Sequence, residues 1–245
     1  MENEPILKVS GISHNYFVES EKIIHVLDNI SFTAIKGEFL SIVGPSGGGK
    51  STILRIIAGL IKPVRGNVTF SGKKISMVFQ NYGIFPWLTV QKNIEFGLLM
   101  SGMAENERRR IVAEKINEVG LVDVGHKYPK ELSGGMRQRV GIARALSVSP
   151  DLILMDEPFS NLDSFTAEKL RQDLLRIWTN SKMTVIMVTH LVEEAIELSD
   201  RILIFGPRPA KIKDEIKLSL SRPREKRSPE FFQITDKIKS EILAN

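Results

Sequence analysis

The chain has 245 residues, 42% of them hydrophobic, and a formal net charge of +5. This length is typical of one large domain or two small ones, and the lack of cysteine excludes disulfides and thiol chemistry, leaving oxygen and imidazole groups for any metal. The first residues form no secretory leader, and no apolar run approaches the roughly 20 residues that cross a bilayer, so we expect a soluble chain that reaches any membrane through a partner or its surface.

Short β-prone runs separated by turn residues dominate the first third of the chain. The strands predicted from them are Ile6–Ile12, Val26–Phe32, Phe39–Val43, Gly66–Phe70 and Ile75–Val78. The apolar run Phe39–Val43 is typical of a buried strand.

A glycine-rich stretch follows that buried strand directly and matches G-x-x-x-x-G-K-[ST] without a gap. Its residues are Gly44, Pro45, Ser46, Gly47, Gly48, Gly49, Lys50, Ser51 and Thr52. The apolar residues between Ile53 and Leu60 recur at helical spacing, so the stretch joins a strand to a helix. Glycines let successive N–H groups face phosphate oxygens, and a helix N-terminus adds favourable charge. Lys50 can reach the phosphates and the Ser51 hydroxyl can ligate Mg²⁺, so the pattern predicts a nucleotide site.

The middle of the chain is predicted to be helical. A helical pattern runs from about Val90 to Val119, and a further helix is predicted over Gly134–Leu146. Ser133 stands in the N-cap position of that helix. The glycines Gly134 and Gly135 expose N–H groups to an anion, although a simple capped helix is the alternative.

Two all-apolar runs, Leu152–Met155 and Val185–Val188, are too short for helices and typical of strands covered on both faces. Between them, Phe165–Thr179 predicts an amphipathic helix. Asp156 and Glu157 follow the first run directly. In a chain with a phosphate loop, this placement suits Asp156 as a Mg²⁺ ligand and Glu157 as the group that polarises an attacking water.

The last segment, Pro229–Leu243, is predicted to form a helix that packs on the chain's own core, with a partner-binding helix as the alternative. Its apolar face comprises Phe231, Ile234, Ile238 and Ile242. Much of the positive charge also lies late, at Arg208, Lys211, Lys213, Lys217, Arg222, Arg224, Lys226 and Arg227. We expect these residues to form a solvated face, with a nucleic-acid or anionic-lipid patch as the alternative. Aromatic residues do not alternate with them, which disfavours binding of single-stranded nucleic acid.

Taken in order, these motifs resemble those of the ATP-binding cassette family over nearly the whole chain. The further matching residues are Gln80 for the Q-loop, Leu132–Met136 for the signature LSGGQ, Asp156 with Glu157 for Walker B, Ser160–Asp163 for the D-loop and His190 for the switch histidine. Met136 replaces the usual glutamine, but we expect function to survive because the backbone and Ser133 carry the anion contact.

The resemblance implies how ATP and Mg²⁺ are bound. Lys50 and the amides of residues 46–52 would hold the triphosphate, and either Tyr16 or the adjacent Phe17 would stack on adenine, with Tyr16 assigned. The metal would be surrounded by Ser51, Gln80 and Asp156.

The resemblance also implies the roles in hydrolysis. Glu157 would be the general base, His190 would contact the γ-phosphate, and Lys50 and Gln80 would complete the catalytic set. Two copies would pack head to tail as a homodimer. Each copy would close on the ATP of the other with Ser133, Gly134, Gly135 and Asp163.

An α/β fold follows from the same resemblance: a RecA-like P-loop NTPase core with a mainly parallel sheet, an N-terminal antiparallel β subdomain and a helical insertion. We expect a single domain over residues 1–245. Within it, the core would cover about 1–83 and 151–210, the helical subdomain about 84–150 and a C-terminal extension about 211–245.

The single phosphate loop and the lack of a spanning segment indicate the separate energy subunit of a transporter, held at the cytoplasmic face of the membrane. The aromatic run Asn81–Leu88 would dock transmembrane permease subunits, with core packing as the alternative.

Phe85–Trp87, residues 132–139 and the late Gly206–Pro209 and Arg222–Arg224 most resemble the nitrate/sulfonate/taurine importer group. This implies import of a small organic anion, with a periplasmic or lipid-anchored binding protein as an indirect partner. A cassette that acts on nucleic acid or in regulation is the alternative, although we expect no nucleic acid partner.

Overall fold

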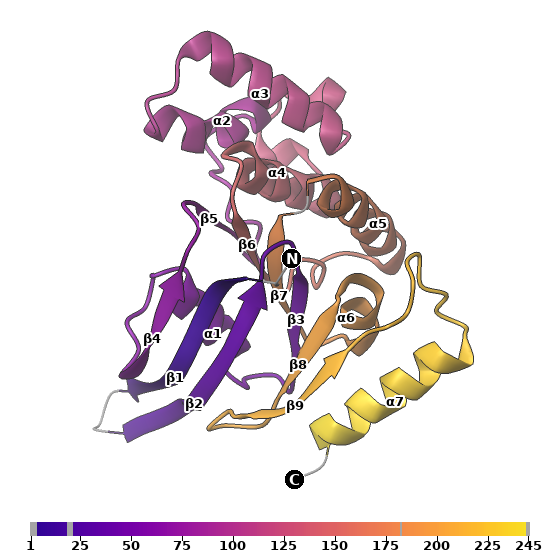
Figure 1. Ribbon diagram of the computed structural model, residues 1–245. Coiled ribbons are helices and arrows are strands. Elements are labelled where there is room, and N and C mark those ends of the chain that lie inside the picture. Colours follow the sequence, from indigo (N-terminus) through magenta and orange to yellow (C-terminus); the bar gives the residue numbers. More distant parts are fainter. Residues whose placement is uncertain (1–3, 19–21, 182, 244–245) are drawn as a thin grey trace. The chain divides into compact units, whose positions relative to one another are not determined.

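The computed structural model describes residues 4–18, 22–181 and 183–243. The chain forms two compact units (Figure 1). The first unit comprises Met1–Gly72 with Thr184–Asn245, and the second comprises Lys73–Met183.

An antiparallel sheet opens the first unit, with the strand order β2-β1-β4 (Figure 1). Its strands are β1 (Pro5–Val18), β2 (Lys22–Ile35) and β4 (Arg65–Phe70). The three strands predicted in this part of the chain are confirmed. β1 extends beyond the predicted end at Ile12 because its pairing with β2 continues through polar residues such as His14 and Asn15.

The other strands of the first unit lie in the order β7-β3-β8-β9. They are β3 (Phe39–Val43), β7 (Thr184–Thr189), β8 (Arg201–Phe205) and β9 (Ile212–Lys217). β3 is parallel to both β7 and β8, and β9 is antiparallel to β8. Every residue of β3, β7 and β8 is buried, as the apolar runs of β3 and β7 predicted. β8 and β9 were not predicted.

The helices described in the first unit are α1 (Lys50–Ile57), α6 (Val192–Leu198) and α7 (Pro229–Leu243). α1 ends before Leu60, where its apolar pattern was expected to continue, because Gly59 takes a φ of 74° that terminates the helix. Phe231 and Ile238 of α7 are buried with residues of α6 and β8. The prediction that this helix packs on the chain's own core is therefore confirmed.

The second unit contains the parallel pair β5 (Ile75–Val78) and β6 (Leu152–Asp156). Its helices are α2 (Val90–Met100), α3 (Glu105–Glu118), α4 (Gly134–Ser147) and α5 (Ser164–Ser181), with short 3₁₀ turns at Val122–Val124 and Pro129–Glu131. The continuous helical pattern predicted from Val90 to Val119 is two helices, because Gly102 takes a φ of 74° between them.

The two units differ in extent from the segments expected for the core and the helical insertion. β5 and β6 belong to the second unit, since they pair with each other and α4 contacts β5. The assignment of residues 1–245 to one domain stays a prediction.

The late basic residues do not form one solvated face. Arg224 is buried, and Arg222 is ion-paired to Asp200 at 2.7 Å. The expected solvated face was wrong for these two residues. Arg224 binds backbone carbonyl groups and Arg222 a carboxylate, and these partners come from an earlier part of the chain.

Candidate functional site

The glycine-rich stretch 44–49 forms a tight loop between β3 and α1. Gly49 is the N-cap of α1 with a φ of 77°, and a Cβ at this position would lie 2.6 Å from Leu27 Cδ2. Only glycine satisfies both the left-handed backbone and the close approach of β2. The first turn of α1 therefore starts directly under the loop, as a phosphate site requires.

Lys50 is the first residue of α1, and its side chain is only 4% exposed. Its Nζ atom donates to the carbonyl oxygens of Gly44 and Pro45, both at 2.9 Å. The ammonium group is thus folded back across the loop, and its positive charge lies where the loop would receive an anion.

His190 lies at the same edge of the sheet as the phosphate loop. Val43, the last residue of β3, pairs with Thr189, the last residue of β7. Because both strands are parallel, the residues that follow them, Gly44 and His190, leave the sheet together. His190 is exposed and does not lie in the core.

The turn that carries His190 is tied to α6. The Thr189 hydroxyl lies 2.9 Å from Glu194 Oε2 and accepts the Leu191 N–H at 3.0 Å. These bonds connect the end of β7 on either side of His190 to the first turns of α6.

Tyr16 reaches the start of α1 from β1. Its hydroxyl lies 3.4 Å from Thr52 Oγ1, and its ring meets His14 edge-on at 4.9 Å. The adjacent Phe17 is 78% exposed. Of the two aromatic candidates, Tyr16 is thus the one that contacts the helix of the phosphate loop.

Arg208 also contacts the phosphate loop, since its Nε donates to the carbonyl oxygen of Gly47. The sequence analysis placed Arg208 among the late basic residues and in the segment Gly206–Pro209 of the importer-group resemblance, but assigned it no contact with the phosphate loop. The contact could have been predicted only from the position of Arg208 just after β8, which pairs with β3 and ends beside the phosphate loop. That strand was not predicted.

In the second unit, Gln80 lies beside Glu157. Val78 of β5 pairs with Met155 of β6, which brings the residues after both strands to one edge. Gln80 Nε2 lies 3.5 Å from Glu157 Oε2, and Asn161 Nδ2 donates to the Gln80 carbonyl at 3.0 Å. The Q-loop, Walker B and D-loop segments are therefore in contact.

The signature segment opens α4 as predicted. Ser133 is the N-cap, and its hydroxyl accepts the Met136 N–H at 3.3 Å. Gly135 has no room for a side chain, because a Cβ would lie 2.4 Å from Thr166 Cγ2 of α5. The second glycine thus allows α4 and α5 to approach closely.

Asp163 hydrogen-bonds the backbone at the start of α5. Its carboxylate accepts the Thr166 N–H at 3.0 Å. This hydrogen bond lowers the pKa of Asp163, since it stabilises the charged form.

The expected metal ligands fit Mg²⁺ by chemistry, since the Ser51 hydroxyl, the Gln80 amide and the Asp156 carboxylate all offer the oxygen that this ion prefers. Asp156 ends β6 and is buried. Among the described residues, no cluster of three or more His, Cys, Asp or Glu could hold a metal alone. Water and the phosphate oxygens of a nucleotide would complete the coordination.

The strand–glycine loop–helix unit on a buried parallel sheet defines the P-loop class of nucleotide-binding proteins. The sequence profile of the ABC transporter family matches residues 27–160. The chain is an ATP-binding cassette ATPase and belongs to this family.

Relatives and a solved structure agree with this membership. The chain is 41% identical over 240 residues to the nitrate import ATP-binding protein NrtD of Synechocystis, covering 91% of this chain and 90% of that protein. It is 42% identical over 239 residues to the aliphatic sulfonates import ATP-binding protein SsuB of Bacillus cereus, covering 95% and 94%. A dimeric ATP-binding cassette in a post-hydrolysis state with ADP and Pi superposes with a TM-score of 0.78 at 35% identity, over 88% of this chain and 100% of that one.

Within the described residues, no helix has both the length and the apolar character that a membrane crossing needs.

Proposed function

We propose that this chain is the ATP-hydrolysing subunit of a bacterial importer for a small anion such as nitrate, a sulfonate or taurine. It would act as a homodimer on a separate transmembrane permease, at the cytoplasmic face of the membrane. The observation that carries the proposal is the phosphate loop in strand register with His190. Relatives named for nitrate and sulfonate import support the choice of cargo class.

In the first unit, the backbone amides of residues 46–52 would bind the triphosphate. The Lys50 ammonium would exchange its bonds to the Gly44 and Pro45 carbonyls for charge-assisted bonds to phosphate oxygens, which are stronger. Tyr16 would stack on adenine, which its contact with Thr52 supports.

Ser51, Gln80 and Asp156 would hold Mg²⁺, which neutralises charge on the phosphates when it is bound. Glu157 would accept the proton of the attacking water. Gln80 Nε2, 3.5 Å from the Glu157 carboxylate, would orient that base. His190 would hydrogen-bond the γ-phosphate, close to the first residues of the loop.

Ser133, Gly134, Gly135 and Asp163 would act on the nucleotide held by the second copy. The N-terminus of α4 presents backbone N–H groups that favour an anion. The similar cassette solved with ADP and Pi is dimeric, which supports this arrangement.

The permease would dock on the second unit, in a cavity of about 390 Å³ lined by Phe79, Phe85, Phe96 and Arg144 among others. Trp87, two residues after Phe85, is 70% exposed. The buried Asn93 braces this loop, since it accepts the Phe85 N–H at 2.7 Å and donates to the Leu88 carbonyl at 2.9 Å. A braced aromatic cavity with one guanidinium suits the end of a short helix, whose carbonyl groups favour a cation.

Several lysines near the end of the chain form ion pairs with carboxylates of the first unit, which disfavours the alternative of a nucleic-acid-acting ATPase. The ion pairs are Lys211–Asp28 at 3.1 Å, Lys226–Glu197 at 3.1 Å, Lys237–Asp214 at 3.6 Å and Lys239–Glu193 at 2.7 Å. Their charges are partly neutralised and do not form one free patch.

Purification of the tagged chain from membranes in mild detergent tests the proposal. It should bring down a multi-span permease, and proteoliposomes that contain both should take up the anion only with internal ATP and Mg²⁺. Lys50→Ala should abolish uptake. A pure chain that neither binds nor hydrolyses ATP with Mg²⁺ would overturn the enzymatic role, whereas an active ATPase that captures no permease would overturn the role in transport.

A further inference from the structure

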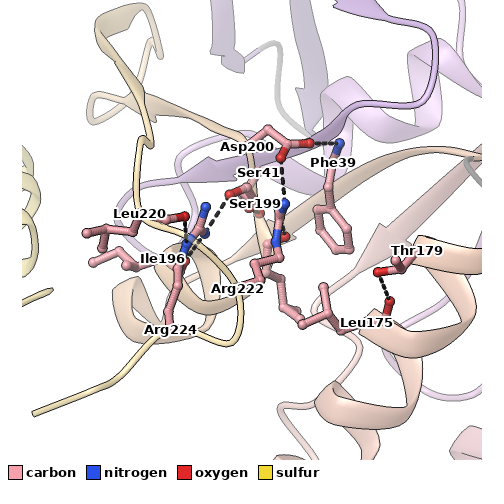
Figure 2. A network of polar contacts seen from close by, with 11 residues as sticks. Phe39, Ser41, Leu175, Thr179, Ile196, Ser199, Asp200, Leu220, Arg222 and Arg224 are labelled. Atoms are coloured by element: carbon pink, nitrogen blue, oxygen red, sulfur yellow. Dashed lines mark hydrogen bonds and ion pairs between the residues drawn. The ribbon is translucent and has the colours of Figure 1, made fainter.

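The segment after β9 packs against helix α6. We call residues 218–243 the C-terminal strap; it contains Arg222, Arg224 and α7. Figure 2 shows the guanidinium of Arg224 among backbone carbonyl groups. Its Nη1 donates to the carbonyl oxygens of Ile196 and, at 2.6 Å, of Ser199, while its Nε donates to Leu220 O at 3.1 Å.

Arg222 makes a second contact to the same helix end. Its Nη2 donates to Leu198 O at 2.7 Å, and its Nη1 pairs with Asp200 Oδ1 at 2.7 Å. Asp200 in turn accepts the Phe39 N–H at 2.9 Å, at the start of β3 (Figure 2). The strap is thereby joined to α6 and to the central strand of the sheet.

Three of the carbonyl groups that Arg222 and Arg224 bind, those of Ile196, Leu198 and Ser199, are groups that a helix C-terminus leaves without intrahelical partners. Two positive charges at this end also favour the helix dipole. Burial, and after it the charge of Arg222, lowers the pKa of Arg224 to about 10, so the buried side chain keeps its charge at neutral pH.

The strap holds the rest of α6 as well. Lys239 pairs with Glu193 at 2.7 Å in the first turn, and Lys226 pairs with Glu197 at 3.1 Å. Phe231 and Ile238 pack with residues of α6 in the same core cluster. With seven residues, α6 is too short to be stable alone, so its contacts with the strap, together with those to β3 and β7, hold it in place.

Helix α6 is joined by hydrogen bonds to the end of β7. Glu194 of α6 lies 2.9 Å from the Thr189 hydroxyl, which also accepts the Leu191 N–H. His190 stands between these two residues. A shift of α6 along its axis would therefore move the turn that presents the imidazole.

We propose that Arg222 and Arg224 are positioning residues for ATP hydrolysis: the strap they anchor holds α6 so that His190 faces the phosphate loop. The inference rests on the role proposed above for His190. It assigns the C-terminal strap a part in the reaction although none of its residues would touch the nucleotide.

The test is steady-state ATPase activity of the full-length chain carrying Arg224→Lys or Arg224→Ala. The lysine variant keeps the charge but offers no planar fork for separate carbonyls. Since small displacements of a catalytic group cost up to about 100-fold, we expect kcat to fall about tenfold or more, with KM for ATP changed by less than about twofold. Arg227→Ala, at an exposed position of the same strap, is the matched control and should keep the wild-type kcat.

A double-mutant cycle separates positioning from general stability. In a His190→Ala background, Arg224→Lys should lower kcat little further, because both changes act through one imidazole. A full additional loss would overturn the inference, as would a wild-type kcat in Arg224→Lys alone. If His190→Ala itself keeps the wild-type kcat, the proposed role of His190 fails and the inference fails with it. If His190→Ala lowers kcat while the Arg224 variants keep the wild-type value, the inference fails but the proposed function stands.

A spectroscopic readout covers the case in which Arg224→Ala does not fold. The chain has four histidines, so the imidazole resonances of the labelled protein can be assigned by substitution. Arg224→Lys should shift the signal of His190, and Arg227→Ala should not. An unmoved His190 signal would contradict the inference.

Discussion

At the scale of single residues, Glu157 combines backbone strain with a specific contact. Its φ of 45° is unusual for a residue with a side chain and costs of the order of 1–3 kcal/mol. We predict that Glu157→Gln lowers hydrolysis about 10²- to 10⁴-fold, as expected for a lost general base, while ATP binding stays intact. Single-turnover hydrolysis and equilibrium binding measure the two effects. Near-normal turnover would refute the assignment, and the exposed Glu107 provides a control as Glu107→Gln.

Two glycines allow backbone strain to be separated from steric overlap. Gly49 and Gly59 have nearly the same φ, 77° and 74°, but only Gly49 would place a Cβ against a neighbour within 4 Å. Both alanine variants should lose about 1–2 kcal/mol from the left-handed backbone. We predict that Gly49→Ala loses more and also weakens nucleotide binding, measured by urea denaturation and with a fluorescent ATP analogue. Equal losses would contradict the overlap with Leu27.

At the scale of elements, adjacent phenylalanines on α7 test its docking. Phe231 is buried in the cluster with α6, whereas Phe232 is 55% exposed. We predict that Phe231→Ala costs about 3–5 kcal/mol and speeds amide exchange along α7, because the helix loses its main anchor. Phe232→Ala should change stability little. Similar exchange in the two variants would show that α7 is held by its ion pairs instead.

At the scale of the whole molecule, the proposed homodimer depends on the N-terminus of α4. We predict that the Glu157→Gln chain becomes dimeric on addition of ATP in sedimentation velocity, because hydrolysis can no longer reopen the pair. Adding Ser133→Arg should abolish this dimer by filling the anion position, while each monomer still binds ATP. Ser133→Thr, which keeps an N-cap hydroxyl, is the control. Loss of ATP binding by the Ser133→Arg monomer would argue against a role across the dimer.

The strands β3 and β5 were predicted to the residue, whereas the apolar runs Leu152–Met155 and Val185–Val188 fall one residue short of β6 at its end and of β7 at both ends. The bounds of β3 could be predicted because a charged residue, Glu38, precedes the strand and Gly44 follows it. β8 and β9 were not predicted, although β8 is equally buried. β9 carries four charged residues among six, so its sequence does not distinguish an edge strand from a loop.

The sequence alone determined the class of protein, because the phosphate loop and the motifs after it are local patterns whose chemistry depends on neighbouring residues and chain order. Only the tertiary structure decided which partners the late arginines have. Arg222 and Arg224 are indistinguishable from solvated residues by composition. The carbonyl of Ser199 that Arg224 binds is 25 residues away along the chain, and it is available only because α6 ends there without partners of its own.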